Sequence, residues 1–140
     1  MPAGHAMRML PIRLQPGDDL RRALEAAVCG AGCEAAFVVS GIGSLSHAEL
    51  RLAGARDSLS LHEGLELLTV SGSVAAGASH LHASVSRSTG EVLGGHVGYG
   101  SIVRTTAEVL LGLLPGWRFT RERDDATGYD ELVVRRIDPD

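Results

Sequence analysis

Apolar residues spaced three and four positions apart predict one helix near the start of the chain. They recur over Leu20–Ala31 and form a single apolar stripe, which is the pattern of a helix that covers one face of a sheet. A turn at Pro16–Asp18 precedes the stripe, and Asp18 is expected to cap the first helical turn. Gly30 and Gly32 are expected to end the helix.

Most of the remaining chain shows the alternating or β-branched pattern of strands. Short turns separate many of these segments, so neighbours in sequence are expected to pair as antiparallel strands. The segment Thr105–Leu114 has a composition that also allows a helix, but its β-branched residues favour a strand. The expected strands are Arg8–Gln15, Glu34–Leu45, His47–Ala53 (as the return strand of a hairpin), Leu65–Val74, Ser79–Val85, Glu91–Val97, Thr105–Leu114, Trp117–Arg123 and Glu131–Arg136.

Length and composition favour one soluble α+β domain over residues 1–140. A chain of 140 residues, 44% of them hydrophobic, is long enough to bury a core without disulfides. The first residues lack the charged start and apolar run of a signal peptide, and no stretch approaches 18 continuous apolar residues. We therefore expect a cytoplasmic protein with no membrane association. The two cysteines, Cys29 and Cys33, lack the further ligands of a structural zinc site.

The charges narrow the classes of function. The chain has 13 basic and 17 acidic residues and a net charge of −4, which gives no general attraction to nucleic acid. All of the basic residues are arginine. The absence of lysine excludes a lysine Schiff base, a phosphate-loop lysine and a serine–lysine catalytic pair.

Three histidines form the candidate metal site. His80 and His82 are two positions apart on an expected strand, so both side chains point to the same face. The next strand brings His96 back toward them, and Gly94-Gly95 before it fits a close approach or a bulge that re-aims the ring. Three imidazoles suit a zinc ion with an open fourth position, although they could also be structural hydrogen-bonding groups. The other histidines are isolated in polar or turn-like surroundings and are expected at the surface: His5, His47 and His62.

Two glutamates interrupt apolar runs and are expected to point inward, where a carboxylate needs a partner. Glu66 shares a face of its expected strand with Leu68 and Val70, and Glu108 interrupts Thr105–Leu114. One interpretation is an ion pair with an arginine. The other makes Glu66 or Glu108 a catalytic candidate, either as an acceptor for a ligating histidine or as a general base on metal-bound water. The candidate ion-pair partners are Arg104, Arg118 and Arg121.

Several short segments, in order, carry a resemblance to a known family. Together they resemble the plants and prokaryotes conserved domain, called PPC, from about Arg13 to Arg136. The segments are Leu14–Leu20, Ser40–Leu45, Gly64–Leu68, His80–His82, Gly94–His96 and Thr105–Glu108.

The resemblance implies a mixed, mostly antiparallel sheet packed with one main helix and assembled as a homotrimer. It also implies a stand-alone prokaryotic type, in which His80, His82 and His96 match histidines that look like a metal site. Plant members carry AT-hooks, short Arg-Gly-Arg-Pro segments that bind the DNA minor groove, and this chain contains none. The label of a DNA-binding protein therefore rests on a motif that is missing here, and the negative charge argues against direct DNA binding.

Two functions follow as hypotheses. The first is a trimeric binding or regulatory module, loaded with a divalent metal, that acts near DNA through protein partners. The second is a zinc-dependent hydrolase or lyase that uses the open position on the metal.

Overall fold

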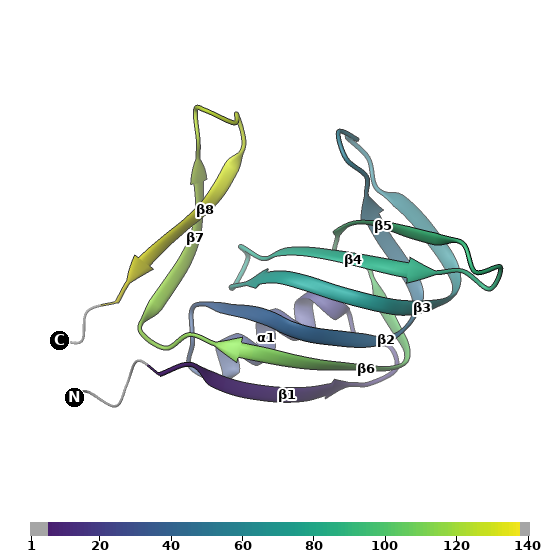
Figure 1. The fold of residues 1–140 in the computed structure, drawn as a ribbon, viewed down its shortest axis with the longest axis horizontal. Helices are drawn as coiled ribbons and strands as arrows, with labels where there is room; N and C mark the ends of the chain where they lie inside the picture. The colour runs from purple at the N-terminus through teal and green to yellow at the C-terminus, as the bar shows by residue number, and fades with distance from the viewer. Residues whose placement is uncertain (1–5, 138–140) are drawn as a thin grey trace.

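The computed structural model describes residues 6–137 as a curved sheet covered on one side by a helix (Figure 1). Within this range, eight strands and one α-helix follow one another. Their bounds are β1 (Arg8–Leu14), α1 (Leu20–Gly30), β2 (Ala36–Arg51), β3 (Leu59–Val74), β4 (His80–Ser86), β5 (Val92–Val97), β6 (Ile102–Leu113), β7 (Trp117–Arg123) and β8 (Asp130–Arg136).

Six strands form the main sheet, in the order β1-β6-β2-β3-β4-β5. Every ladder between these strands is antiparallel, so the expected mostly antiparallel sheet with one helix is confirmed. The sheet also curls, because the end of β2 pairs with β5 as well as with β3. This closure sets Arg51 of β2 directly opposite His96 of β5.

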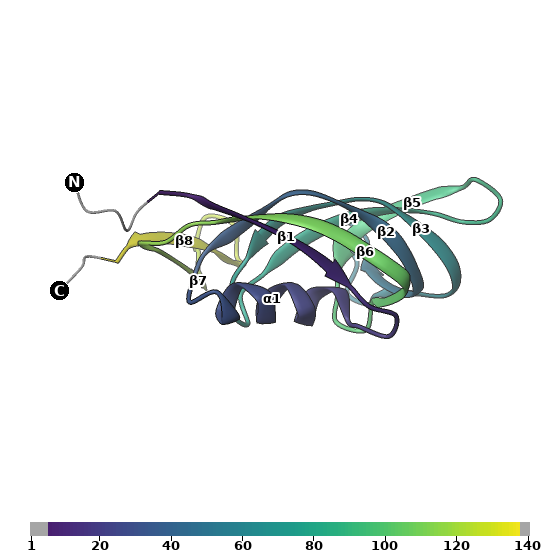
Figure 2. The ribbon, with the colours of Figure 1, turned by 90° about the horizontal axis from the view of Figure 1, so that it is seen from below.

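The helix α1 packs against one face of the sheet, as Figure 2 shows from the side. Leu20, Leu24 and Val28 are fully buried there, in agreement with the apolar stripe. The expected N-cap is wrong by one residue: the Asp19 carboxylate accepts the bond from the Arg22 amide at 3.0 Å. Asp18 instead closes the preceding turn, since its carboxylate accepts from the amide of Gln15 at 2.8 Å.

The strand β2 corrects the expectation of a hairpin between Glu34–Leu45 and His47–Ala53. The chain runs straight through this region as one strand of 16 residues. Bulges absorb the irregular pattern, because the pairing of β2 with β6 shifts register between Gly43 and Leu45 and again before His47. Its hairpin partner is β3, which begins at Leu59 rather than at Leu65.

The strands β7 and β8 form the expected C-terminal hairpin as a separate two-stranded sheet. The hairpin stands away from the main sheet in Figure 1. Phe119 attaches it through a small second core with Ala35 and Ala75. No helix in residues 6–137 is long and apolar enough to cross a membrane.

Candidate metal centre

Strand pairing brings the three candidate histidines into one cluster. His82 of β4 lies directly opposite His96 of β5, and His80 lies one strand repeat before His82. The Nε2 atom of His80 is 3.1 Å from Nε2 of His82 and 3.2 Å from Nδ1 of His96. The sequence-based expectation that these rings converge is therefore confirmed.

Alternation along the strands turns the cluster away from the core. Leu81, Ala83 and Val97 are buried, so their neighbours His80, His82 and His96 point to the opposite face. The rings of His80 and His82 are exposed and that of His96 is half-buried. An ion or a ligand can therefore reach the cluster from solvent.

Two glycines let the backbone pack tightly around the cluster. A Cβ on Gly95 would lie 2.7 Å from the Arg51 carbonyl oxygen, where β5 meets β2. A Cβ on Gly72 would collide with the His80 carbonyl oxygen, and the φ of Gly72 is +129°. The close approach expected at Gly94-Gly95 is confirmed, but the bulge is not, because β4 and β5 pair without a register shift.

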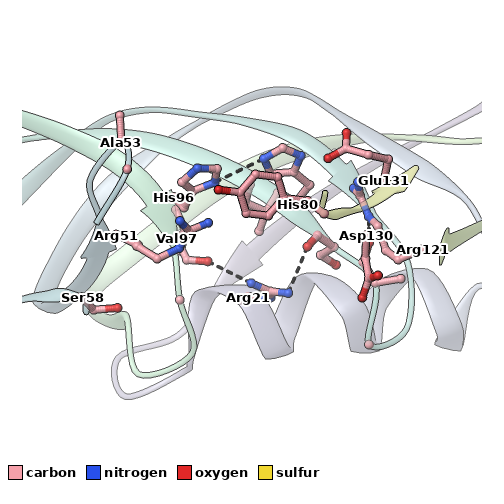
Figure 3. Close-up of a pocket in the computed structure, with 17 residues that line it drawn as sticks. Arg21, Arg51, Ala53, Ser58, His80, His96, Val97, Arg121, Asp130 and Glu131 are labelled. Atoms are coloured by element: carbon pink, nitrogen blue, oxygen red, sulfur yellow. Dashed lines mark hydrogen bonds between the residues drawn. The ribbon is translucent and has the colours of Figure 1, made fainter. Parts of the chain in front are cut away.

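Arg21 of α1 ties together the two strand ends that carry the histidines. Its guanidinium donates to the carbonyl of Ser79 at 3.0 Å and to that of Val97 at 3.1 Å. Ser79 precedes His80 and Val97 follows His96 in the chain. Figure 3 shows both bonds beneath the histidines. The Ser79 hydroxyl also donates to the Glu25 carboxylate at 2.6 Å, so α1 holds this corner through two side chains.

The surroundings favour the neutral forms of His80 and His96. Partial desolvation of the ring is the main cause that lowers the pKa of His80 below its ordinary 6.5, followed by repulsion from His82 and Arg121, while Glu131 acts in the opposite direction. Burial also lowers the pKa of His96, with repulsion from Arg51 next in size. Neutral imidazole is the form that binds metals.

The geometry of the ring nitrogens fits a metal ion. All three ligand nitrogens lie within 4.8 Å of one another. Nitrogens on a tetrahedral ion with bonds of about 2.0–2.1 Å stand roughly 3.3–3.4 Å apart, close to the distances around His80. A ring nitrogen carries either one hydrogen or one lone pair, so Nε2 of His80 cannot form two good hydrogen bonds with its two neighbours. An ion between the rings would use all three lone pairs.

The structure does not bring Glu66 or Glu108 to the histidines. Both side chains are exposed, so the expected inward orientation is wrong. They line a second groove together with Arg104, and this groove shares no residue with the pocket beside the histidines. A bulge between Leu67 and Thr69 explains Glu66, because the extra residue turns Val70 inward while Glu66 stays on the outer face.

The remaining histidines lie away from this cluster or outside the described residues. His47 and His62 were expected to be isolated, but they are cross-strand partners on β2 and β3 with ring centroids 4.6 Å apart. His62 is exposed and His47 is half-buried, so both lie at or near the surface. The expected isolation is wrong, because the two residues are partners. His5 lies outside the described residues.

Sequence reasoning missed two arginines of this region, Arg21 and Arg51. Arg21 is the second residue of α1, and in the sequence it resembles any solvated helix position until the ends of β4 and β5 are placed beside it. Arg51 reaches His96 only through the pairing of β2 with β5, which joins residues 45 positions apart. No local pattern in the sequence signals such a long-range pairing.

Comparison with known proteins gives a family match over most of the chain. The model of the Plants and Prokaryotes Conserved (PCC) domain matches residues 1–115. Two curated relatives from Synechococcus strains, both named bifunctional protein GlmU, are 42% identical over 137 residues. The match covers 98% of this chain and 22% of each relative, so the chain spans about a fifth of the length of those proteins.

Solved structures share the fold. A hypothetical protein from Salmonella has a TM-score of 0.89 and 36% identity, with 94% of this chain and 96% of that chain covered. A protein from Archaeoglobus fulgidus described as metal-containing has a TM-score of 0.77 and 27% identity, with 95% and 99% covered. A protein from Bacteroides thetaiotaomicron for which DNA binding has been suggested has a TM-score of 0.76 at 19% identity, with 93% and 97% covered, and shows the fold alone.

Proposed function

The chain belongs to the Plants and Prokaryotes Conserved domain family, and from this premise we propose that it is a metal-binding module with a divalent ion on His80, His82 and His96. The observation that carries the proposal is the convergence of three imidazole nitrogens from two adjacent strands. The description of the Archaeoglobus relative as metal-containing supports it.

Zinc is the ion that this ligand set fits best. Three neutral nitrogen ligands without a carboxylate suit zinc, which tolerates four-coordinate geometry and an open fourth position. Calcium and magnesium prefer oxygen ligands, which the cluster does not offer. Bound zinc would supply a Lewis acid at an accessible surface.

The module's biological role, in this proposal, is regulatory and exercised as a homotrimer. The assembly follows from family resemblance, and exposed apolar side chains on β2 and β3 are consistent with it. A role near DNA would run through protein partners, because the chain carries a net charge of −4 and no AT-hook.

A zinc-dependent enzyme is the second candidate, and the pocket beside His80 and His96 favours it. A hydrolase or lyase of this kind needs a group that moves a proton near the metal. Glu66 and Glu108 line the other groove, whereas Asp130 and Glu131 line the histidine pocket. The proton-transfer group of such an enzyme would therefore come from the β8 strand.

Elemental analysis tests the metal proposal. Protein purified without added metal is expected to contain about one zinc ion per chain, and His82→Ala is expected to lose it because two ligands hold zinc far more weakly than three. His62→Ala is the matched control, since it removes another exposed histidine of a strand outside the cluster. Metal-free wild-type protein, or equal metal content in wild type and His82→Ala, would contradict the proposal.

A further inference from the structure

A pocket of about 680 Å³ opens beside the histidine cluster. Elements far apart in the sequence build its walls: α1, the loop after β2, the ends of β4 and β5, and the β7–β8 hairpin (Figure 3). His80 and His96 belong both to the pocket and to the proposed metal site. A volume of this size accommodates a small molecule.

Two of the three arginines in the pocket are available to a ligand. Arg21 uses both terminal nitrogens on the carbonyls of Ser79 and Val97, so it is part of the framework. Arg121 of β7 donates from Nε to the carbonyl of Ala78 at 3.2 Å and from one terminal nitrogen to the Ser73 hydroxyl at 3.1 Å. These bonds fix the Arg121 side chain and leave its other terminal nitrogen without a hydrogen-bond partner among residues 6–137.

Arg51 has a different position, and among residues 6–137 it forms no hydrogen bond or ion pair through its side chain. It lies directly across from His96 at the end of β2. Within the part of the chain that the structure describes, no carboxylate or carbonyl accepts a hydrogen bond from its guanidinium. Figure 3 shows Arg51 on the His96 side of the pocket and Arg121 on the side of Glu131. The two guanidinium groups therefore flank the histidine cluster, Arg51 acting on His96 and Arg121 on His80.

The charge of the pocket favours an anion. Three guanidinium groups line it, against the carboxylates of Asp130 and Glu131. A divalent ion on three neutral imidazoles would keep both of its positive charges and would take an oxygen ligand at its open position. Guanidinium groups match the paired oxygens of carboxylates and phosphates.

We propose that this pocket binds a small molecule through an oxyanion group, a carboxylate or a phosphate, which Arg51 and Arg121 hold beside the metal ion. The inference rests on the proposed metal site. It also gives a role to the β7–β8 hairpin, which lies beyond residues 1–115 of the family match and supplies Arg121.

Isothermal titration calorimetry with zinc-loaded protein tests the inference, with inorganic phosphate and acetate as separate probes. Wild-type protein is expected to bind at least one probe, and Arg51→Gln is expected to weaken that binding at least tenfold without loss of zinc. Arg13→Gln is the matched control, because Arg13 is an exposed arginine of β1, at the opposite edge of the sheet from β5. Arg121→Gln is the second variant, and it removes the charge. Arg121→Lys keeps the charge, so comparison of these two variants separates loss of charge from loss of the hairpin's hydrogen bonds.

The outcomes separate this inference from the metal proposal. Binding of phosphate alone, or of acetate alone, supports the inference and assigns the oxyanion. Zinc-loaded protein that binds neither probe, or an Arg51→Gln variant with unchanged affinity for the probe that wild type binds, overturns the inference and leaves the metal site intact. Protein that takes up no zinc overturns the metal proposal, and the inference falls with it.

Discussion

At the scale of single residues, the histidine cluster is held by groups that would not themselves bind the proposed metal ion. Arg21 fixes the carbonyls next to His80 and His96, and Gly72 and Gly95 give the backbone the room it needs. The backbone positions beside His80 and His96 are therefore set by the fold itself. Such preorganisation reduces the ordering cost of metal binding.

The lowered pKa of His80 and His96 predicts a pH dependence for the metal-free protein. In the unfolded chain these rings take up protons near their ordinary pKa of 6.5, but in the folded protein only at lower pH. The unfolded state thus binds more protons in this window, so stability is complete above pH 6.5 and falls as the pH drops through the folded pKa.

Thermal unfolding of chelator-treated protein measures this effect. The Tm is expected to fall between about pH 7.5 and about pH 5.5, and the fall is expected to be smaller in His80→Gln, which cannot take up the proton. His62→Gln serves as the control and should behave as wild type. An identical pH dependence in wild type and His80→Gln would contradict the role given to His80.

The residue scale also shows what the sequence can and cannot predict about the site. Two residues of one strand and one of the next were enough to predict the convergence of His80, His82 and His96, because strand alternation and a short turn are local rules. Glu66 and Val70 point to opposite faces because of a bulge between Leu67 and Thr69. The sequence alone does not reveal this bulge. The proximity of Arg51 depends on a pairing between distant strands.

At the scale of elements, β3 and β4 must approach each other closely at the start of β4. Gly72 lies opposite Leu81, and an added methyl group would strike the carbonyl oxygen of His80. The same glycine has a φ of +129°, which L side chains rarely adopt. The position of His80 therefore depends on a residue that has no side chain.

Gly72→Ala is expected to lower the free energy of unfolding by about 2–4 kcal/mol and to weaken zinc binding. Chemical denaturation and zinc titration measure the two effects. Gly30→Ala, at the end of α1, adds the same methyl group in open space and should lower neither the stability nor the zinc affinity. Wild-type stability and zinc affinity in Gly72→Ala would show that β3 and β4 tolerate the methyl group.

The elements themselves were largely predictable. The helix α1, the β4–β5 hairpin and the β7–β8 hairpin follow from apolar spacing and turn residues, and the structure confirms them. The strand β2 was not predictable as one element, because its glycines and polar residues resemble a turn. In the structure, pairing with both β3 and β6 keeps this segment extended. Tertiary hydrogen bonds outweigh local preference there.

At the scale of the whole molecule, the outer face of β2 and β3 exposes apolar side chains. Phe37, Val39, Ile42 and Leu68 are each more than 40% exposed although they are large and apolar. Ile42 and Leu68 line the same groove, and a contiguous apolar surface of this kind is typical of a contact with another protein. The homotrimer expected from family resemblance would bury such a surface.

Light scattering coupled to size exclusion tests this assembly. One chain has a mass of 14.7 kDa, so the expected trimer has three times that mass, about 44 kDa. Ile42→Glu is expected to shift the mass toward 14.7 kDa, because it introduces a charge into the apolar face. Val92→Glu is the control, as Val92 is an exposed apolar residue of β5. A wild-type mass of one chain at all concentrations would contradict the trimer.

The central claim is that the three histidines hold one metal ion, and anomalous X-ray diffraction tests it most directly. Crystals of protein purified without added metal would be measured on both sides of the zinc absorption edge. One anomalous peak per chain is expected between the ring nitrogens of His80, His82 and His96. Crystals without such a peak, in which the rings hydrogen-bond to one another or to backbone carbonyls, would contradict it.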